Sequence, residues 1–379
     1  MADNLGATYP TAATAPKPRD AVPARPSHRF GHRKDAVLLM ALGVALLVTA
    51  LAALGIGAVP IGLGGVAAIL VEPLGITLPW GHTDSERTVL ETIRAPRVAL
   101  GALVGAGLGV AGAAMQGLFR NPLADPALVG VSSGAALAAV SMIVLGATVF
   151  KAWSGWLGLY ALPVAAFAGG VLATLVVYRF ANVGGRTVVA SMLLAGIAVN
   201  AIAAALTGAL TFIADDAQLR TLTFWTLGSL GGASWERVGI VFTFLLIPLI
   251  LIPRHARALN ALLLGESEAM HLGYDLERLK RRIVLLVALC VGAAVSMTGI
   301  IGFIGLVVPH LIRLAIGPDH RALIPASALL GATLLLLADL LARTAVAPAE
   351  LPIGIVTAAI GGPFFLWLLG RRQQGSGWR

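Results

Sequence analysis

Long apolar runs separated by short polar breaks make up the chain from residue 36 onward. A helix needs about 20 predominantly apolar residues to cross the hydrocarbon core of a bilayer. The pattern therefore predicts an all-α polytopic membrane protein with about ten transmembrane helices. These helices are expected over residues 36–58, 97–118, 128–147, 157–180, 188–212, 236–253, 283–300, 303–316, 321–342 and 352–370.

Two segments depart from this regular pattern. The run at residues 303–316 is short and broken by Gly302, Gly305 and Pro309, which favours a half-span or a bent helix that other helices shield from lipid. Residues 214–234 begin with charged side chains and continue into an apolar and aromatic stretch at 224–232. This second segment predicts a short re-entrant helix rather than a full span.

Little of the chain lies outside the apolar runs. Residues 1–35 are polar and lack apolar periodicity, so we expect a disordered cytoplasmic tail there and a transmembrane domain over residues 36–372. The first apolar run begins too late and is too long for a secretory signal. Only 12% of the residues are charged, whereas roughly a quarter are charged in soluble domains. The mean hydropathy of +0.89 agrees with a chain that lies mostly within a bilayer.

The basic residues are unevenly distributed across the predicted spans. In a ten-span topology both termini lie on one side of the membrane, and 20 of the 27 lysines and arginines share that side. Cytoplasmic loops carry the excess of basic residues in membrane proteins. The distribution therefore predicts cytoplasmic N- and C-termini. The seven residues on the opposite side are Arg87, Arg94, Arg97, Lys151, Arg220, Arg237 and Arg343.

Several kinds of chemistry are excluded by what the sequence lacks. No Gly-x-x-x-x-Gly-Lys-Ser/Thr stretch occurs, so any ATP that drives this protein must be bound by another subunit. The single cysteine, Cys290, excludes an intrachain disulfide and a cysteine-based metal cluster. No His-Glu-x-x-His motif occurs, and no basic patch carries interleaved aromatic residues. We expect no catalytic residue, no bound metal and no nucleic-acid partner.

Glycines repeat every four residues in the second predicted span, at positions 101, 105 and 109. One face of that helix is then nearly bare backbone, which allows another helix to approach closely. Gly107, Gly109 and Gly112 also match the spacing of a dinucleotide-binding fingerprint. No strand precedes them, and they lie inside an apolar run, so helix packing explains them better.

Charged residues at the ends of two spans are candidates for function. Asp339 and Arg343 are four residues apart near the end of the ninth span. Ionisable residues within spans are costly and often functional, but an ion pair within one helix explains the same spacing. Arg94 and Arg97 frame a proline just outside the second span. They can anchor the helix at the interface or bind acidic residues of a partner.

The predicted cytoplasmic loop at residues 254–282 is the longest polar segment after the tail. Its apolar stretches at 259–264 and 270–273 flank a Gly-Glu-Ser turn, which predicts two short amphipathic helices. A solvated loop is the simpler interpretation. An exposed apolar face is unfavourable in water, however, and favours a docking surface for a cytosolic partner.

Several stretches together resemble the FecCD permeases, the membrane subunits of type II ABC importers for iron-siderophores, heme and cobalamin. The matching stretches lie at residues 94–97, 112–126, 130–134, 262–273, 302–313, 339–343, 350–354 and 361–364. They follow one another in order, and the resemblance covers roughly residues 60–370.

The resemblance implies a homodimer with ten helices per subunit around a central pathway. It also implies two cytosolic ATP-binding subunits, which use ATP and Mg²⁺, and a periplasmic heme-binding protein on the opposite side. The resemblance further implies that the protein resides in the inner membrane of a bacterium, where the chain is in direct contact with the lipid bilayer. No cofactor would be permanently bound to the chain itself.

The resemblance also implies roles for particular residues. Arg94, Arg97 and Arg343 would receive the binding protein, with Asp339 orienting Arg343. The fifth span, the 214–232 segment and the tenth span would line the pathway. The expected gate residues are Phe224, Trp225, Gly228, Ser229 and Leu230. The expected coupling residues towards the ATPase are Leu262, Leu263, Gly265, Glu266, Ser267, Met270 and Gly273.

The cargo is the finer question. Residues 216–230 look most like heme permeases, although siderophore permeases share the Trp-x-x-Gly-Ser part. An apolar pathway with few ligating groups suits a flat hydrophobic cargo, because tight ligation would trap it. Heme is therefore the favoured cargo, with a ferric siderophore or cobalamin as alternatives.

Two other classes of protein fit less well. An ion-coupled secondary transporter needs ionisable residues near the midplane of the membrane, and the only candidate, Asp339, lies near the end of a span. A membrane-embedded enzyme needs clustered His, Glu or Asp side chains at membrane depth, and the sequence provides none.

Overall fold

The structure is a computed structural model that describes residues 29–375. Most of the tail predicted for residues 1–35 lies outside the described residues. Its last part, residues 29–35, is helical and forms the beginning of the first helix.

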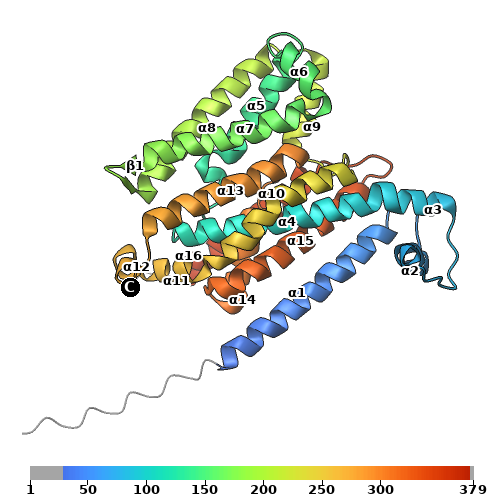
Figure 1. Ribbon diagram of the computed structural model, residues 1–379, viewed down its shortest axis with the longest axis horizontal. Helices are drawn as coiled ribbons and strands as arrows, with labels where there is room; N and C mark the ends of the chain where they lie inside the picture. The colour runs from blue at the N-terminus through green and yellow to red at the C-terminus, as the bar shows by residue number, and fades with distance from the viewer. Residues whose placement is uncertain (1–28, 376–379) are drawn as a thin grey trace, which may run out of the picture.

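The described chain is almost entirely helical (Figure 1). The α-helices are α1 (Arg29–Gly55), α2 (Leu63–Val71), α3 (Asp84–Thr88), α4 (Ala95–Leu118), α5 (Val131–Leu145), α6 (Lys151–Leu157), α7 (Ala161–Ala181), α8 (Val189–Phe212), α9 (Asp216–Leu227), α10 (Trp235–Arg254), α11 (Ala256–Leu264), α12 (Glu266–His271), α13 (Leu276–Thr298), α14 (Ile304–Ile316), α15 (His320–Thr344) and α16 (Ile353–Gly375). Short turns of other helix types are η1 (Glu72–Leu74), η2 (Val89–Arg94), η3 (Pro126–Val129) and η4 (Gly158–Tyr160). A hairpin of two strands, β1 (Asn182–Val183) and β2 (Arg186–Thr187), joins α7 to α8.

Each of the ten predicted spans is occupied by a helix. Within the described residues, seven helical segments are long and apolar enough to cross a membrane, judged by length and composition. They include α1, α4, α7, α8, α10, α13 and α15. The other three predicted spans correspond to shorter apolar helices, namely α5, α14 and the apolar part of α16.

The predicted second span begins earlier than expected. Helix α3, η2 and α4 follow one another without a break, so the helical segment runs over Asp84–Leu118. Its first turn is fixed by a capping box, in which Thr83 and Glu86 satisfy each other's backbone amides. The charged residues of this extension lower the local hydropathy, which is why the apolar pattern alone placed the boundary at residue 97.

Helices α4, α13 and α15 lie at the centre of the molecule, and α5, α7, α8 and α9 form a second group beside them (Figure 1). In the most apolar 18-residue stretch of each span, 72% of the residues are buried for the segment that contains α4 and for α13. The corresponding share is only 17% for α1 and for α8. Because α1 and α8 are apolar as well as exposed, their free faces suit lipid or another subunit and not water.

The glycine face of α4 is packed as the sequence predicts. A Cβ added at Gly105 would lie well under 3.0 Å from the backbone of Gly331 in α15. The same holds for Gly109 against Ser327, and for Gly112 against Gly305 in α14. The small residues therefore allow backbone-to-backbone contact across the centre of the bundle.

Of the three predicted breaks near α14, Gly302 lies in the non-helical link before the helix. Helix α13 ends at Thr298, and the non-helical link contains Gly299 and Phe303, both with positive φ. Gly305 and Pro309 lie inside α14 and do not interrupt it. Neighbouring helices can satisfy the backbone group that a proline leaves free, so α14 tolerates Pro309. The predicted short helix within residues 214–234 is α9, which has 12 residues.

Candidate functional site

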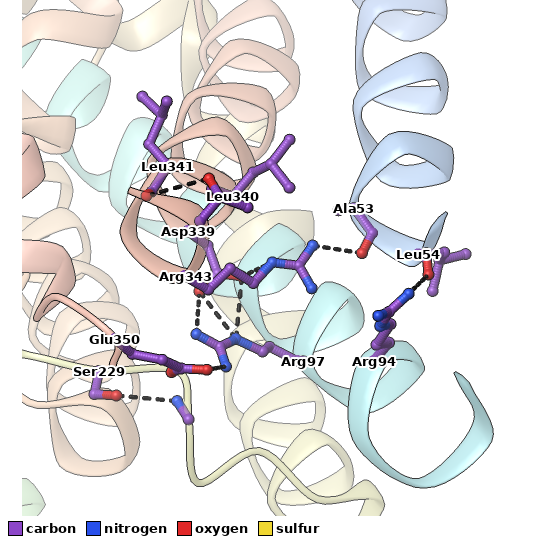
Figure 2. A network of polar contacts seen from close by, with 12 residues as sticks. Ala53, Leu54, Arg94, Arg97, Ser229, Asp339, Leu340, Leu341, Arg343 and Glu350 are labelled. Atoms are coloured by element: carbon purple, nitrogen blue, oxygen red, sulfur yellow. Dashed lines mark hydrogen bonds and ion pairs between the residues drawn. The ribbon is translucent and has the colours of Figure 1, made fainter. Parts of the chain in front are cut away.

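Three arginines gather around the C-terminal end of α1 (Figure 2). Arg94 comes from η2, Arg97 from α4 and Arg343 from the last turn of α15. All three are buried: Arg94 is 4% exposed, Arg97 is 7% exposed, and the side chain of Arg343 is 7% exposed. They were expected to receive a partner, so their internal contacts decide what a partner could reach.

Arg97 lies between two carboxylates (Figure 2). Its Nη2 donates to Oδ1 of Asp339 over 2.8 Å, and its Nε lies 3.0 and 3.1 Å from the two carboxylate oxygens of the same residue. Its Nη1 donates to Oε1 of Glu350 over 2.9 Å. Planar, two-pronged pairing of this kind is the strongest geometry for an arginine and a carboxylate.

Arg94 and Arg343 bind the carbonyl groups at the end of α1. Arg94 donates to the carbonyls of Leu54 and Gly55 over 2.7 and 2.8 Å, and also to that of Val59. Arg343 donates through Nη2 to the carbonyl of Ala53. The last carbonyls of a helix have no partner within the helix, so these two arginines supply the missing donors.

The charges in this cluster do not cancel. Arg94, Arg97 and Arg343 carry three positive charges, against two negative charges on Asp339 and Glu350. The negative end of the α1 dipole offsets part of the surplus. Arg343 is the least satisfied member, because its Nε lies 3.8 Å from Asp339 and meets no hydrogen-bond acceptor among the described residues. An additional carboxylate would therefore be favourable here.

The structure changes the expected role of Asp339. The ion pair with Arg343 within α15 exists only at 3.8 Å, whereas Arg97 on α4 takes the close contacts. Asp339 thus orients Arg97 more than Arg343. Glu350 received no role from the sequence, although it stands in one of the family stretches, just before a proline that precedes α16.

The predicted gate segment lies where α9, α13 and α16 meet. Gly228 has a positive φ of 70°, and its carbonyl accepts from the amide of Ile353 at 3.1 Å. The amide of Ser229 donates to the carbonyl of Thr298, at the end of α13, over 2.7 Å. A Cβ at Gly228 would also collide with the carbonyl of Ile300. Glycine is required here both for conformation and for space.

The five predicted gate residues do not share one environment. Phe224 is 58% exposed and Ser229 is exposed, whereas Trp225 is partly buried. Leu230 is fully buried and packs against the glycine face of α4 at Gly101. Phe224 and Ser229 are therefore accessible in this conformation, and Leu230 holds the segment onto the bundle.

The predicted coupling segment forms two short helices, as the sequence pattern indicates. Helix α11 ends at Leu264, Gly265 makes the turn with a φ of 134°, and α12 follows directly. Gly273 ends the segment, also with positive φ. The turn positions therefore need glycine, because a side chain strains this region of backbone conformation.

The exposed apolar side chains of this segment are only partly those predicted. Leu264, Met270 and Leu272 are 69%, 56% and 61% exposed, and Ser267 is exposed beside them. Leu263 is half-buried, and Leu262 is 1% exposed and belongs to the core. Leu262 can therefore support the segment but cannot contact a partner in this conformation. Because a helix has 3.6 residues per turn, Leu262 lies on the face of α11 that points into the bundle.

Lys280 connects the coupling segment to two other elements. It is 2% exposed, and its Nζ donates to Oε2 of Glu266 over 3.0 Å and to the carbonyl of Thr187 over 2.8 Å. Glu277 accepts from the amide of the same Thr187 over 2.8 Å. The buried ammonium group of Lys280, in the second turn of α13, thus links this helix to α12 and to the hairpin between α7 and α8. Sequence reasoning missed Lys280, since it stood in a run of basic residues.

Asn260 makes a second connection, from α11 to the start of α15. Its side-chain oxygen accepts from the amide of His320 at 2.9 Å, and its amide donates to Asp319 over 2.6 Å. Burial raises the pKa of the Asp319 carboxyl, but hydrogen bonds from the Arg321 amide and from Asn260 outweigh it and hold that pKa below its usual value. The carboxylate acceptor is therefore ionised at neutral pH.

No group of three or more His, Cys, Asp or Glu side chains could hold a metal ion within residues 29–375, as far as their side chains are described. The described chemistry is that of two polar tethering sites at opposite ends of an apolar bundle.

The sequence profile of the FecCD transport family matches residues 45–371, and the chain belongs to this family. It is 50% identical over 286 residues to the hemin transport system permease protein HmuU of Yersinia pestis, covering 75% of this chain and 84% of that one. It is 41% identical over 317 residues to the cobalamin import system permease protein BtuC of Halobacterium salinarum, covering 83% of each chain. The vitamin B12 import system permease protein BtuC of Escherichia coli O157:H7 is 44% identical over 278 residues, or 73% of this chain and 82% of that one.

A solved structure agrees with the family. It is described as an inward-facing conformation of a metal-chelate type ABC transporter, and it matches with a TM-score of 0.76 and 31% identity over 89% of this chain and 99% of that one. The protein is thus a permease subunit of a type II ABC importer, and separate subunits hydrolyse the ATP. The predicted fold class is confirmed.

Proposed function

We propose that this permease carries heme across the inner membrane of a bacterium. The observation that carries the proposal is the 50% identity with a hemin permease over most of both chains, against 44% and 41% for the cobalamin permeases. The apolar and aromatic end of α9, with Phe224 exposed, supports a flat hydrophobic cargo. Residues that bind such a cargo weakly would let it move on.

The permease works as a homodimer around a central pathway, with its N- and C-termini in the cytoplasm. The exposed apolar faces of α8 and α16 support a partner copy there, since Ile197, Ile202 and Ile360 among others are exposed. The excess of basic residues on the side of the α11–α12 segment supports the orientation. A periplasmic binding protein then docks at the opposite end, near the arginine cluster.

Two ATPase subunits dock on the α11–α12 segments of the dimer. The exposed side chains of Leu264 and Met270 offer them an apolar surface, and Lys280 and Asn260 would pass their movement to the spans. When ATP closes the ATPase dimer, the tethered helices move as rigid units, so the outer gate shuts and the inner one opens. The 228–230 segment would be part of the outer gate, because it joins α9, α13 and α16.

Cobalamin or a ferric siderophore is the second candidate cargo. Two cobalamin permeases match over comparable lengths, and the matching solved structure is of metal-chelate type. The permease would be reconstituted with its ATPase subunits and its cognate binding protein in lipid nanodiscs or vesicles. We expect heme to stimulate ATP hydrolysis and to accumulate inside the vesicles. Stimulation by cyanocobalamin or a ferric siderophore, with none by heme, would replace the proposed cargo.

The same vesicles test the remote alternative of an ion-coupled transporter. We expect uptake to require ATP and to continue when a proton uncoupler is added. Uptake that needs no ATP and stops with the uncoupler would overturn the proposed function as a whole.

A further inference from the structure

Glu350 differs from the other charged residues of the arginine cluster in its exposure. Its side chain is 46% exposed, whereas those of Arg97 and Asp339 are 8% and 1% exposed. It lies on the connection between α15 and α16 and holds one nitrogen of Arg97, while Asp339 holds the others (Figure 2). Arg97 therefore has one permanent, buried acceptor and one acceptor at the surface.

An acidic side chain that approaches from outside can bind Arg97 by replacing Glu350, but not by replacing Asp339. Asp339 is sealed in the bundle and bound by three hydrogen bonds, so it cannot be replaced without leaving a buried charge unpaired. The bond from Nη1 to Glu350 can be exchanged at little cost, because half-exposed ion pairs contribute little to stability. The surplus of one positive charge in the cluster favours binding of such an incoming carboxylate.

The position of Glu350 is connected to the 228–231 segment. The backbone of the α15–α16 connection is tied by Ile353, whose amide donates to the carbonyl of Gly228 over 3.1 Å. A Cβ built on Gly231 would be in van der Waals contact with Oε2 of Glu350 at 3.5 Å. The ion pair with Arg97 is thus one of the contacts that fix this connection to α4, and its loss would leave the backbone bond to Gly228 as the link between the connection and the 228–231 segment.

We propose that Glu350 is an exchangeable counter-ion of Arg97, which the carboxylate of an acidic docking protein displaces. The inference rests on the proposed docking of the binding protein at the arginine cluster. In the undocked permease Glu350 occupies the docking position and keeps the 228–231 segment closed. On docking, the incoming carboxylate takes its place on Nη1, and the released α15–α16 connection allows the segment to open.

The test measures the affinity of the cognate binding protein, fluorescently labelled, for the permease–ATPase complex in nanodiscs. Glu350→Gln removes the competing charge, so we expect docking about 1.5- to fivefold tighter than in the native complex, the range for one partly exposed ion pair. The dependence on salt should also steepen, because docking then forms a new ion pair instead of exchanging one. Glu350→Ala should show the same two changes.

The matched control is Glu91→Gln. Glu91 is 42% exposed and pairs with Arg87 at 3.1 Å, so it resembles Glu350 in exposure and in partner but lies outside the cluster. We expect no change in affinity for this variant. Arg97→Gln, measured in parallel, should weaken docking, and thermal unfolding of every complex identifies variants that have lost their fold.

The outcomes separate the two levels of the proposal. If Arg97→Gln weakens docking while both Glu350 variants dock as the native complex does or more weakly, the counter-ion role is overturned and docking at Arg97 stands. If Arg97→Gln leaves docking unchanged, the docking site and the role of Glu350 both fall. A second readout is ATP hydrolysis without binding protein, which we expect to rise in Glu350→Gln; an unchanged rate would overturn the connection to the gate.

Discussion

Arg97 and Asp339 form a buried ion pair although 242 positions separate them in the chain. Nη2 and Oδ1 are 2.8 Å apart, and the pair joins the first turn of α4 to the C-terminal part of α15. These two helices also meet through backbone contacts at Gly105 and Gly109, so the ion pair fixes their register at one end. Four predictions follow from this and related contacts.

Asp339→Asn should lower the free energy of unfolding by about 3–5 kcal/mol, because it leaves a buried arginine without its charge partner. Thermal unfolding of the purified permease in detergent measures the change. Arg87→Gln is the control, since Arg87 is 41% exposed and ion pairs at the surface contribute little to stability. Equal stability of Asp339→Asn and the native chain would contradict the importance of the pair.

Arg94→Gln should loosen α1 without unfolding the centre of the bundle. The variant loses charged hydrogen bonds to carbonyls of Leu54 and Gly55, each of which contributes about 1.5–3 kcal/mol in favourable settings. Limited proteolysis of the link at residues 56–62 reports this loosening as faster cleavage. Arg179→Gln replaces an exposed arginine on α7 and should leave the cleavage rate unchanged.

Gly112→Ala should strongly reduce the yield of folded protein. Its Cβ would overlap the backbone of Gly305, which no side-chain movement can relieve. Gly239→Ala is the matched control, because Gly239 is also helical and a Cβ there meets nothing within 4 Å. The control should be neutral or more stable by about 0.5–1 kcal/mol. Size-exclusion profiles and unfolding temperatures distinguish the two, and a well-folded Gly112→Ala would refute the packing argument.

Lys280→Met should uncouple ATP hydrolysis from uptake. The variant cuts the contacts of α13 with Glu266 and Thr187, so α12 can move without the spans. We expect uptake per ATP hydrolysed to fall severalfold in vesicles, and the same for Glu266→Gln or for a paired Glu266 and Leu263 replacement.

A charge exchange controls for simple damage to the fold. The double variant Glu266→Lys with Lys280→Glu restores the ion pair and should recover part of the coupling relative to Lys280→Glu alone. Normal cargo-dependent coupling in Lys280→Met would show that the segment transmits motion by another contact.

The arginine cluster illustrates how far the sequence could be interpreted. Family stretches identified Arg94, Arg97 and Arg343 as residues that act together, and the structure brings them to one place. Their burial was not predictable, because the carbonyls that Arg94 binds belong to α1, about 40 positions away. Glu350 was missed because its partner Arg97 lies 253 positions away and a single sequence records no distances, whereas Lys280 was missed because it stands in a run of basic residues.

The sequence by itself determined the bilayer as the solvent, the positions of ten apolar helices and the glycine contacts of α4, because hydropathy and side-chain size act over a few neighbouring residues. It also placed the helix–Gly–helix form of residues 256–271. The tertiary structure alone decided which charges are buried, which acceptor each arginine uses and which face of α11 and α12 is exposed. Burial and ion pairing depend on contacts between elements that lie from 14 to 290 positions apart in the chain, and packing in the bundle fixes those contacts.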